Sequence, residues 1–131
     1  DGSATAKNCL YDGNGVGDGF NGTFAAASDY NASDIAADAP GANSKNGTRP
    51  TFVDYTNGDL HLASSDTWAK DAGADLSGDA TYPITSDFDG VTRIAPWDIG
   101  ADEFVPAAGE LLARSRWVRS REPLIQRAIY A

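Results

Sequence analysis

The sequence has no methionine, only one cysteine and only one histidine among its 131 residues. A lone cysteine, Cys9, excludes an internal disulfide, which suits a cytosolic protein or an external fold that does without bridges. We expect Cys9 to be a small buried apolar residue. A Ser-His-Asp catalytic site would need His61, and no G-x-S-x-G motif accompanies it, so we expect His61 to be a structural strand residue.

Long apolar runs are also absent from the sequence. No stretch of about 18 apolar residues occurs, so the sequence predicts no membrane span, and no signal-peptide pattern is present. Because the chain starts at Asp1 and contains no methionine, we expect a processed product or part of a longer one.

Large apolar side chains are scarce, because many of the 41% hydrophobic residues are alanine. Glycine, of which there are 14, and abundant Asp, Asn, Ser and Thr separate the larger side chains. This composition disfavours long helices and favours short strands joined by turns. The length allows one domain with a modest core.

The charge is distributed unevenly along the chain. Residues 1–104 hold 17 of the 19 acidic residues and 5 of the 10 basic ones, a net charge of −12, whereas residues 105–131 carry +3. An acidic body repels nucleic acid and anionic membranes, so we expect neither as a partner. The basic segment suits an acidic protein surface, including that of a second copy.

The N-terminal region contains a weak internal repeat. Residues 8–12 and 31–34 both begin with Asn and end with Asp, and residues 53–54 follow at a similar spacing. The period falls in the range typical of solenoids, in which each coil buries its face against the next and a recurring Asn can stack in a ladder. The alternative is that Asn and Asp are simply common here. Residues 38–50 are predicted to be an exposed loop.

Residues 52–62 have the pattern of a β-hairpin. Asn57-Gly58 is the strongest turn signal, and alternation then places Leu60 and Leu62 on one face and His61 on the other.

A glycine-rich segment at residues 12–19 resembles a Ca²⁺ loop. Asp12, Asn14 and Asp18 are its candidate ligands. Val16 stands at a ligand position, and Thr23 replaces the expected glutamate. The alternative, which we favour, is a flexible glycine turn.

Four fragments occur in order within residues 52–104. They are Asp-Leu-His-Leu at 59–62, Lys-Asp-Ala-Gly at 70–73, Asp-Phe-Asp-Gly at 87–90 followed by Arg93, and Asp-Ile-Gly-Ala-Asp-Glu-Phe at 98–104. This order resembles the C-terminal end of right-handed parallel β-helix proteins of the pectin-lyase-like superfamily. The resemblance is close over residues 52–104 and loose over 8–51. The chain departs from the family by having fewer coils and a basic C-terminal segment.

The resemblance implies a cap that closes the last coil of the β-helix. The structural cap residues that we expect are Asp71, Gly73, Asp89, Gly90, Arg93, Trp97, Asp98, Gly100 and Phe104.

The predicted roles of these cap residues differ. The three glycines are expected to adopt positive φ at tight turns. Arg93 is expected to form a bidentate pair with Asp98 or Asp89. Trp97 and Phe104 are expected to plug the end of the core.

The cap carboxylates have two possible uses. Asp87 with Asp89, or Asp98 with Asp102 and Glu103, are candidate paired carboxylates for glycoside hydrolysis. Lyases of the superfamily often bind Ca²⁺, so Asp87 and Asp89 are also candidate calcium ligands. The alternative, which we favour, is that these side chains hold turns and salt bridges. We therefore expect no catalytic residue and no cofactor, with Ca²⁺ as the only candidate ion.

The segment after Phe104 has a different character. Its first part has helix-forming composition, Pro123 ends any helix there, and residues 124–130 form a plausible strand. The predicted partner-binding residues are Arg114, Arg116, Trp117, Arg119, Arg121, Arg127 and Tyr130. Trp and Arg are common anchors of protein contacts, so we expect a docking arm, the alternative being a disordered tail.

The sequence thus predicts an all-β fold, a short right-handed parallel β-helix end with a C-terminal cap, followed by an extended or partly helical basic tail. Its expected parts are coils with an exposed loop at 1–51, the cap at 52–104 and the arm at 105–131. The expected function is a non-enzymatic structural or adhesive module on a cell surface or virus particle, for example of a phage. Its partners are a protein scaffold or like copies, with surface carbohydrate as a further partner. The alternative is the C-terminal part of a polysaccharide lyase or glycoside hydrolase.

Overall fold

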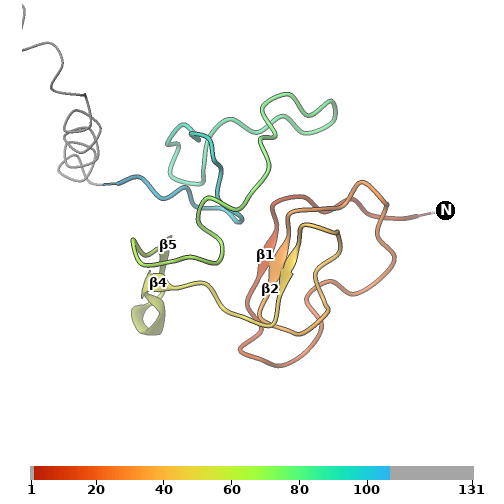
Figure 1. Ribbon diagram of the computed structural model, residues 1–131, viewed down its shortest axis with the longest axis horizontal. Helices are drawn as coiled ribbons and strands as arrows, with labels where there is room; N and C mark the ends of the chain where they lie inside the picture. The colour runs from red at the N-terminus through yellow and green to blue at the C-terminus, as the bar shows by residue number, and fades with distance from the viewer. Residues whose placement is uncertain (1, 107–131) are drawn as a thin grey trace, which may run out of the picture.

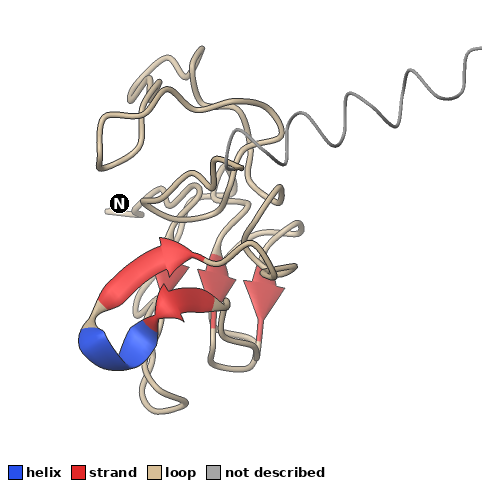
Figure 2. Cartoon of the chain, turned by 90° about the vertical axis from the view of Figure 1, so that its left-hand side faces the viewer, coloured by secondary structure: helices blue, strands red, loops and turns tan. Residues whose placement is uncertain are grey.

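The computed structural model describes residues 2–106, which are made up of short strands and turns (Figures 1 and 2). The elements are β1 (Leu10–Tyr11), β2 (Ala32–Ser33), β3 (Lys45–Asn46), β4 (Phe52–Asp54), the 3-10 turn η1 (Tyr55–Asn57) and β5 (Asp59–Leu62). The predicted β-rich, mostly non-helical class is confirmed. None of the helical structure within these residues is long and apolar enough to cross a membrane.

The first three strands form a parallel sheet in the order β1-β2-β3. Leu10 pairs with Ala32, at a sequence spacing close to that of the predicted repeat. Ala32 pairs next with Lys45, at a much shorter spacing. The prediction of an exposed loop over residues 38–50 is therefore wrong at β3. The predicted third repeat, residues 53–54, is also wrong, since it lies in antiparallel β4.

The early return of the chain to β3 follows from the turn at residues 40–44. Ser44 donates its backbone N–H to the carbonyl of Gly41 at 3.3 Å, which closes a tight turn. The Ser44 hydroxyl also donates to the Pro40 carbonyl and accepts from the N–H of Asn31. These contacts bring the polar pair Lys45–Asn46 beside β2, so β3 is set by tertiary contacts rather than by strand propensity.

Asn31 links the segments that carry β1 and β2 from inside the fold. Its side chain is fully buried, donates to the carbonyls of Ala6 and Pro40, and accepts from the N–H of Cys9. Asn8, its predicted ladder partner, instead bonds the backbone of Ala74 in both directions. The repeated asparagines therefore satisfy separate backbone groups and do not form a ladder.

Cys9 is exposed, contrary to the expectation of burial. The side chains that enter the interior near it belong instead to Ala6, Asn31 and Ala32.

The predicted hairpin is confirmed. β4 and β5 pair antiparallel, and Gly58 ends the connecting turn with a φ of 84°. Leu62 is 3% exposed and enters the core, but Leu60 is 52% exposed. The two leucines therefore do not share a buried environment, because the core covers only the end of β5.

A small apolar core joins the sheet, the hairpin and residues 63–104, which are the rest of the expected cap. Its buried members are Ala32, Leu62, Ala69 and Ile99, with Leu10, Phe52, Ala72 and Phe104 packed against them. Trp97 is also buried, at 4% exposure. Phe104 packs against this core, whereas Trp97 is not among the residues of the cluster, so their expected role as plugs of the core stays a prediction.

The cap attaches to the first strand region rather than to β3. Gly100 donates its N–H to the carbonyl of Asn8 at 2.9 Å, and Lys7 forms a 2.6 Å ion pair with Asp79. In Figure 2 the hairpin lies in front of one face of the parallel sheet. Among residues 2–106, no strand pairs with β3 on its outer side.

Two of the three predicted glycine conformations are confirmed. Gly90 and Gly100 have φ values of 81° and 114°. Gly73 is not in the positive-φ region, and the reason for glycine there is space. A Cβ at Gly73 would lie 2.5 Å from the carbonyl oxygen of Asp98, and the Gly73 N–H donates to the carbonyl of Trp97 at 2.6 Å.

Candidate functional site

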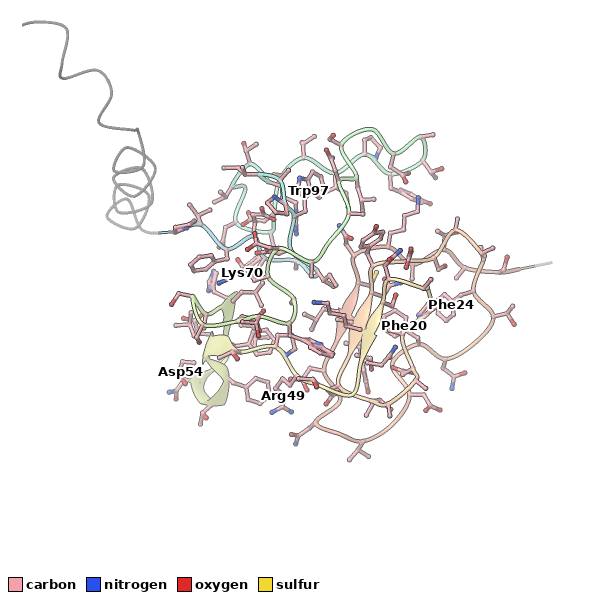
Figure 3. The ribbon with its side chains drawn as sticks, viewed as in Figure 1. Phe20, Phe24, Arg49, Asp54, Lys70 and Trp97 are labelled. Atoms are coloured by element: carbon pink, nitrogen blue, oxygen red, sulfur yellow. The ribbon has the colours of Figure 1, made fainter. Side chains whose placement is uncertain are left out.

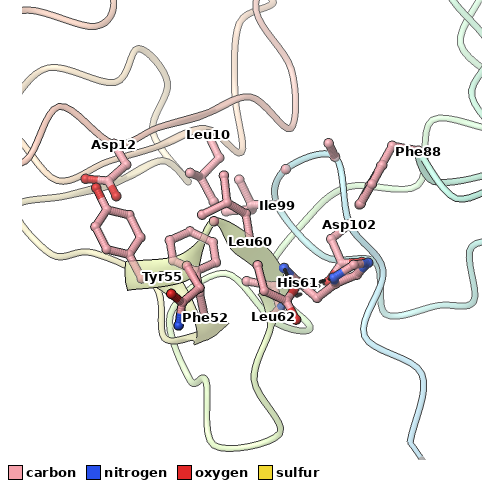
Figure 4. A pocket seen from close by; sticks show the side chains of 15 residues that line it. Leu10, Asp12, Phe52, Tyr55, Leu60, His61, Leu62, Phe88, Ile99 and Asp102 are labelled. Atoms are coloured by element: carbon pink, nitrogen blue, oxygen red, sulfur yellow. Dashed lines mark hydrogen bonds and ion pairs between the residues drawn. The ribbon is translucent and has the colours of Figure 1, made fainter.

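A groove of about 780 Å³ lies between the parallel sheet and the hairpin (Figure 4). Its apolar lining comes from the sheet, from the hairpin and from the segment that follows the hairpin. It comprises Leu10, Phe52, Leu60, Leu62, Phe88 and Ile99. Polar side chains stand at its two ends, with Asp12 beside Tyr55 at one and His61 beside Asp102 at the other.

His61 is the centre of the polar cluster at this second end. Asp59 and His61 alternate with Leu60 on β5, so both side chains are directed to the same face. His61 Nδ1 lies 2.6 Å from Asp59 Oδ1, and its Nε2 lies 2.7 Å from Asp89 Oδ2. These hydrogen bonds, to Asp59 first and then to Asp89, raise the pKa of His61 to about 9. The same contact with His61 lowers the pKa of Asp59.

Asp102 completes the cluster from the cap. It is 8% exposed, and its Oδ2 accepts the N–H of Leu62 at 2.6 Å. One candidate ligand atom from each of His61, Asp89 and Asp102 lies within 4.8 Å of the other two. Asp89 was predicted in the cap, but this arrangement was not predicted from the sequence. The Asp59-x-His61 spacing on a predicted strand was the available signal.

Arg49 organises the opposite end of the groove, between the sheet and the hairpin (Figure 3). Its Nε lies 2.9 Å from Asp12 Oδ2, and its Nη2 donates to Asn14 Oδ1 at 2.7 Å. The guanidinium also lies 4.3 Å from the centre of the Tyr55 ring. Two of the three candidate calcium ligands in this loop thus contact a cation of the chain itself. The calcium site stays a prediction.

The glycine-rich loop at residues 12–19 is held by carboxylates that follow β2 in the chain. Asp34 accepts the N–H groups of Gly13 and Gly15, at 2.9 and 2.6 Å, and Asp38 accepts that of Gly19 at 3.1 Å. Burial of Asp34 opposes its ionisation, but the N–H groups of the two glycines, together with Asp12 and the charge of Arg49, lower its pKa. Asp18, the third candidate calcium ligand, is exposed.

Arg93 forms a buried ion pair, but with a different partner from the predicted ones. Its Nη1 lies 3.1 Å from Glu103 Oε2, and the two side chains are 5% and 4% exposed. Arg93 also donates to the backbone carbonyls of Asp98 and Gly100. The predicted pairing with Asp98 or Asp89 is therefore wrong, because the turn at residues 98–103 presents Asp98 to Arg93 through its backbone.

Asp98 is a buried backbone acceptor. Its two oxygens accept the N–H groups of Asp71 and Phe104 at 2.6 and 2.5 Å, and its exposure is 2%. Burial, together with the charges of Glu103 and Asp71, raises the pKa of Asp98 to about 6 against the pull of these hydrogen bonds.

Asp66 is a second buried anchor, and it was not predicted from the sequence. At 1% exposure, it accepts the N–H groups of Thr51, Trp68, Ala69 and Lys70 at 2.7 to 3.1 Å. Burial opposes its ionisation, but the four N–H groups prevail and its pKa is lowered. The Asp-x-x-Ala-Lys stretch at 66–70 resembles ordinary turn sequence, so only the three-dimensional contacts reveal this role.

The other candidate carboxylates divide into two kinds. Asp87 Oδ1 accepts the N–H groups of Asp89 and Val91 and so shapes the turn at residues 87–91. Asp89, with its side chain 47% exposed, reaches His61 instead. The structure thus separates the candidate pair Asp87–Asp89 into a turn former and a member of the His61 cluster.

The predicted arm lies outside the described residues, apart from Val105 and Pro106. This holds for all seven candidate partner-binding residues, Arg114, Arg116, Trp117, Arg119, Arg121, Arg127 and Tyr130.

Comparison with known proteins gave no match to the chain. This was so for protein-family models, for curated proteins and for solved structures. The resemblance to β-helix ends therefore stays a prediction that rests on four sequence fragments.

Proposed function

We propose that the protein is a non-enzymatic structural module of an extracellular or virion-surface assembly. In this proposal the parallel strands and the cap form a short β-helix end, and residues 105–131 dock it to a protein scaffold or to like copies. The observation that carries the proposal is the use made of the carboxylates. Asp34, Asp38, Asp66 and Asp98 all accept backbone N–H groups from distant parts of the chain.

These hydrogen bonds favour a structural role for the carboxylates over a catalytic one. A carboxylate held by several N–H groups is fixed in place, and in Asp34 and Asp66 these contacts also favour the ionised form, which makes them poor proton donors to a substrate. The alternative, part of a lyase or hydrolase, needs two carboxylates that face a substrate. Asp98 is 2% exposed and Asp87 is engaged by its own turn, so these contacts favour the structural function.

The outer side of β3, which pairs with no other strand of residues 2–106, supports an assembly role. An edge strand exposes backbone N–H and C=O groups that can pair with another chain. The cap bonds to the region of Asn8 and Lys7, which leaves the two edges of the sheet in different environments. Attachment through the arm adds charge complementarity, since residues 1–104 carry −12 and residues 105–131 carry +3.

The docking role is tested by neutralising the arm in the full chain. We expect replacement of its five arginines, Arg114, Arg116, Arg119, Arg121 and Arg127, by glutamine to abolish self-association, measured by sedimentation velocity over a range of concentrations. The matched control replaces the same arginines by lysine, which keeps the charge, and we expect it to retain much of the association. Added salt should weaken the wild-type complex, because the contact is between exposed charges.

Two outcomes would count against this proposal. If the glutamine variant associates as strongly as the wild type, the arm does not dock the module. If the wild type stays monomeric at every concentration, like copies are excluded as partners.

A further inference from the structure

We propose that His61, Asp89 and Asp102 bind one divalent transition-metal ion of the Zn²⁺ class. The three residues come from β5, from the turn at residues 87–91 and from the cap region at 98–104, and their candidate ligand atoms lie within 4.8 Å of one another. This inference is independent of the proposed docking function.

The geometry is close to that of a bound ion. In a tetrahedral site, ligands at about 2.1 Å from a Zn²⁺ ion lie about 3.4 Å apart, so binding requires the ligand atoms to approach one another by up to about 1.5 Å. Asp89 is able to make this adjustment, because its side chain is 47% exposed and stands at a turn. Asp102 is already fixed, because its Oδ2 accepts the N–H of Leu62.

Asp59 supplies the support that a metal-binding histidine usually has. Metal-ligating histidines commonly donate their other ring N–H to a carboxylate, which sets the tautomer and the ring orientation. Asp59 Oδ1 lies 2.6 Å from His61 Nδ1, so Nε2 is the nitrogen left to bind the ion. Nε2 points toward Asp89, and thus toward the proposed site.

The chemistry of the donors selects the class of ion. One imidazole nitrogen and two carboxylate oxygens suit Zn²⁺ and its neighbours in the first transition series, whereas Ca²⁺ prefers six to eight oxygen ligands. Three protein ligands leave a fourth position for water, on the side of the groove where His61 and Asp102 line it. The nearby Asp59 adds further negative charge, which offsets the charge of the ion.

A proton competes with the metal ion for His61 Nε2. Without metal, His61 holds a proton on Nε2 and bridges Asp59 and Asp89 as an imidazolium, an arrangement that fits the same distances. Metal binding must displace that proton. Binding measurements therefore distinguish a metal site from a hydrogen-bonded ion pair.

The test uses the full chain after treatment with chelator, titrated with ZnCl₂ in a calorimeter. We expect one ion per chain, and at least tenfold weaker binding in both Asp89→Asn and His61→Gln. Asp18→Asn is the matched control, since it removes an exposed aspartate far from the cluster along the chain, and it should bind as the wild type does. Titration with CaCl₂ should give far weaker binding at this site.

A second measurement separates ligand loss from misfolding. Asp102→Asn also disturbs the hydrogen bond to Leu62, so the exposed Asp89 is the decisive position, and NMR of the His61 ring should show Zn²⁺-dependent shifts at Nε2. Wild-type-like binding in Asp89→Asn, binding of several ions unaffected by the variants, or unchanged His61 signals would each overturn the site. The outcome does not depend on the arginine variants, so either proposal can fail without the other.

Discussion

At the scale of single residues, Asp98 shows how burial and hydrogen bonding compete. Its carboxylate is 2% exposed and accepts two backbone N–H groups, yet burial prevails and its pKa is raised to about 6 from 3.8. A folded-state pKa above the unfolded value means that the folded protein holds this proton more tightly. The stability that Asp98 contributes is therefore present below about pH 4 and is lost as the pH rises through about 6.

This predicts a pH dependence that belongs to one side chain. Between pH 4 and pH 6, we expect the free energy of unfolding of the wild type to fall by about 1–3 kcal/mol relative to Asp98→Asn, whose side chain does not titrate. Urea unfolding at each pH measures this difference. Asp75→Asn is the control, because the pKa of Asp75 is lowered, so its effect belongs below pH 4. Parallel profiles for the wild type and Asp98→Asn would contradict the prediction.

The partners of individual residues were the hardest feature to predict from sequence. Asp98 and Arg93 were both expected in the cap, but the pair was expected between them or with Asp89. Arg93 has several carboxylates within reach along the sequence, and only the path of residues 98–103 selects Glu103. The His61 cluster was missed for the same reason, because Asp89 and Asp102 come from segments much further along the chain.

At the scale of elements, the crossing of residues 70–74 over residues 97–98 fixes the cap. Gly73 brings the two backbones together, with its N–H bonded to the carbonyl of Trp97. There is no room for a side chain at this crossing, because a Cβ would lie 2.5 Å from the carbonyl oxygen of Asp98. Both partners are backbone, so the contact cannot be relieved by a rotamer change.

We expect Gly73→Ala to destabilise the protein by about 1–3 kcal/mol, the usual cost of forcing extra volume into a packed site. Chemical unfolding measures the cost. Gly78→Ala is the matched control, since a Cβ there meets nothing within 4 Å, and we expect it to be neutral or slightly stabilising. Equal stabilities of the two variants would show that the crossing is not tight.

Elements with local signals were predicted better than those without. The hairpin at residues 52–62 was predicted because Asn57-Gly58 is a strong turn signal within a short stretch of chain. The spacing between the first two parallel strands, from Leu10 to Ala32, was also close to the predicted repeat. In contrast, β3 was missed because Lys45–Asn46 has neither apolar alternation nor strand propensity, and Ser44 and Asn31 place it through tertiary contacts.

At the scale of the whole molecule, the described core is small for the length of chain it supports. Four of the eight buried hydrophobic residues are alanines, and Ile99 is the largest fully buried side chain. Ile99 belongs to one cluster with Ala32 of the sheet, Leu62 of the hairpin and Ala69 of the segment that follows it. The loss of this one side chain should therefore weaken every part of the described fold.

We expect Ile99→Ala to cost about 2–5 kcal/mol, a large part of the roughly 5–15 kcal/mol that typical domains possess. Thermal and urea unfolding should show the loss as a single transition shifted to lower temperature and lower denaturant. Ile94→Ala is the control, because Ile94 is 65% exposed, and its effect should stay within about 0.5 kcal/mol. A similar cost for both variants would contradict the central place of Ile99.

The carboxylate contacts have a consequence for what opens this fold. Small domains with modest cores often depend on disulfides, and reducing agents unfold them. Here distant segments are joined by hydrogen bonds from backbone N–H groups to carboxylates, such as that from Gly13 to Asp34 and that from Thr51 to Asp66. Both carboxyls have lowered pKa values, so the stability that they contribute is lost as the pH falls below about 4. Acid, rather than a thiol reductant, is therefore expected to break these hydrogen bonds.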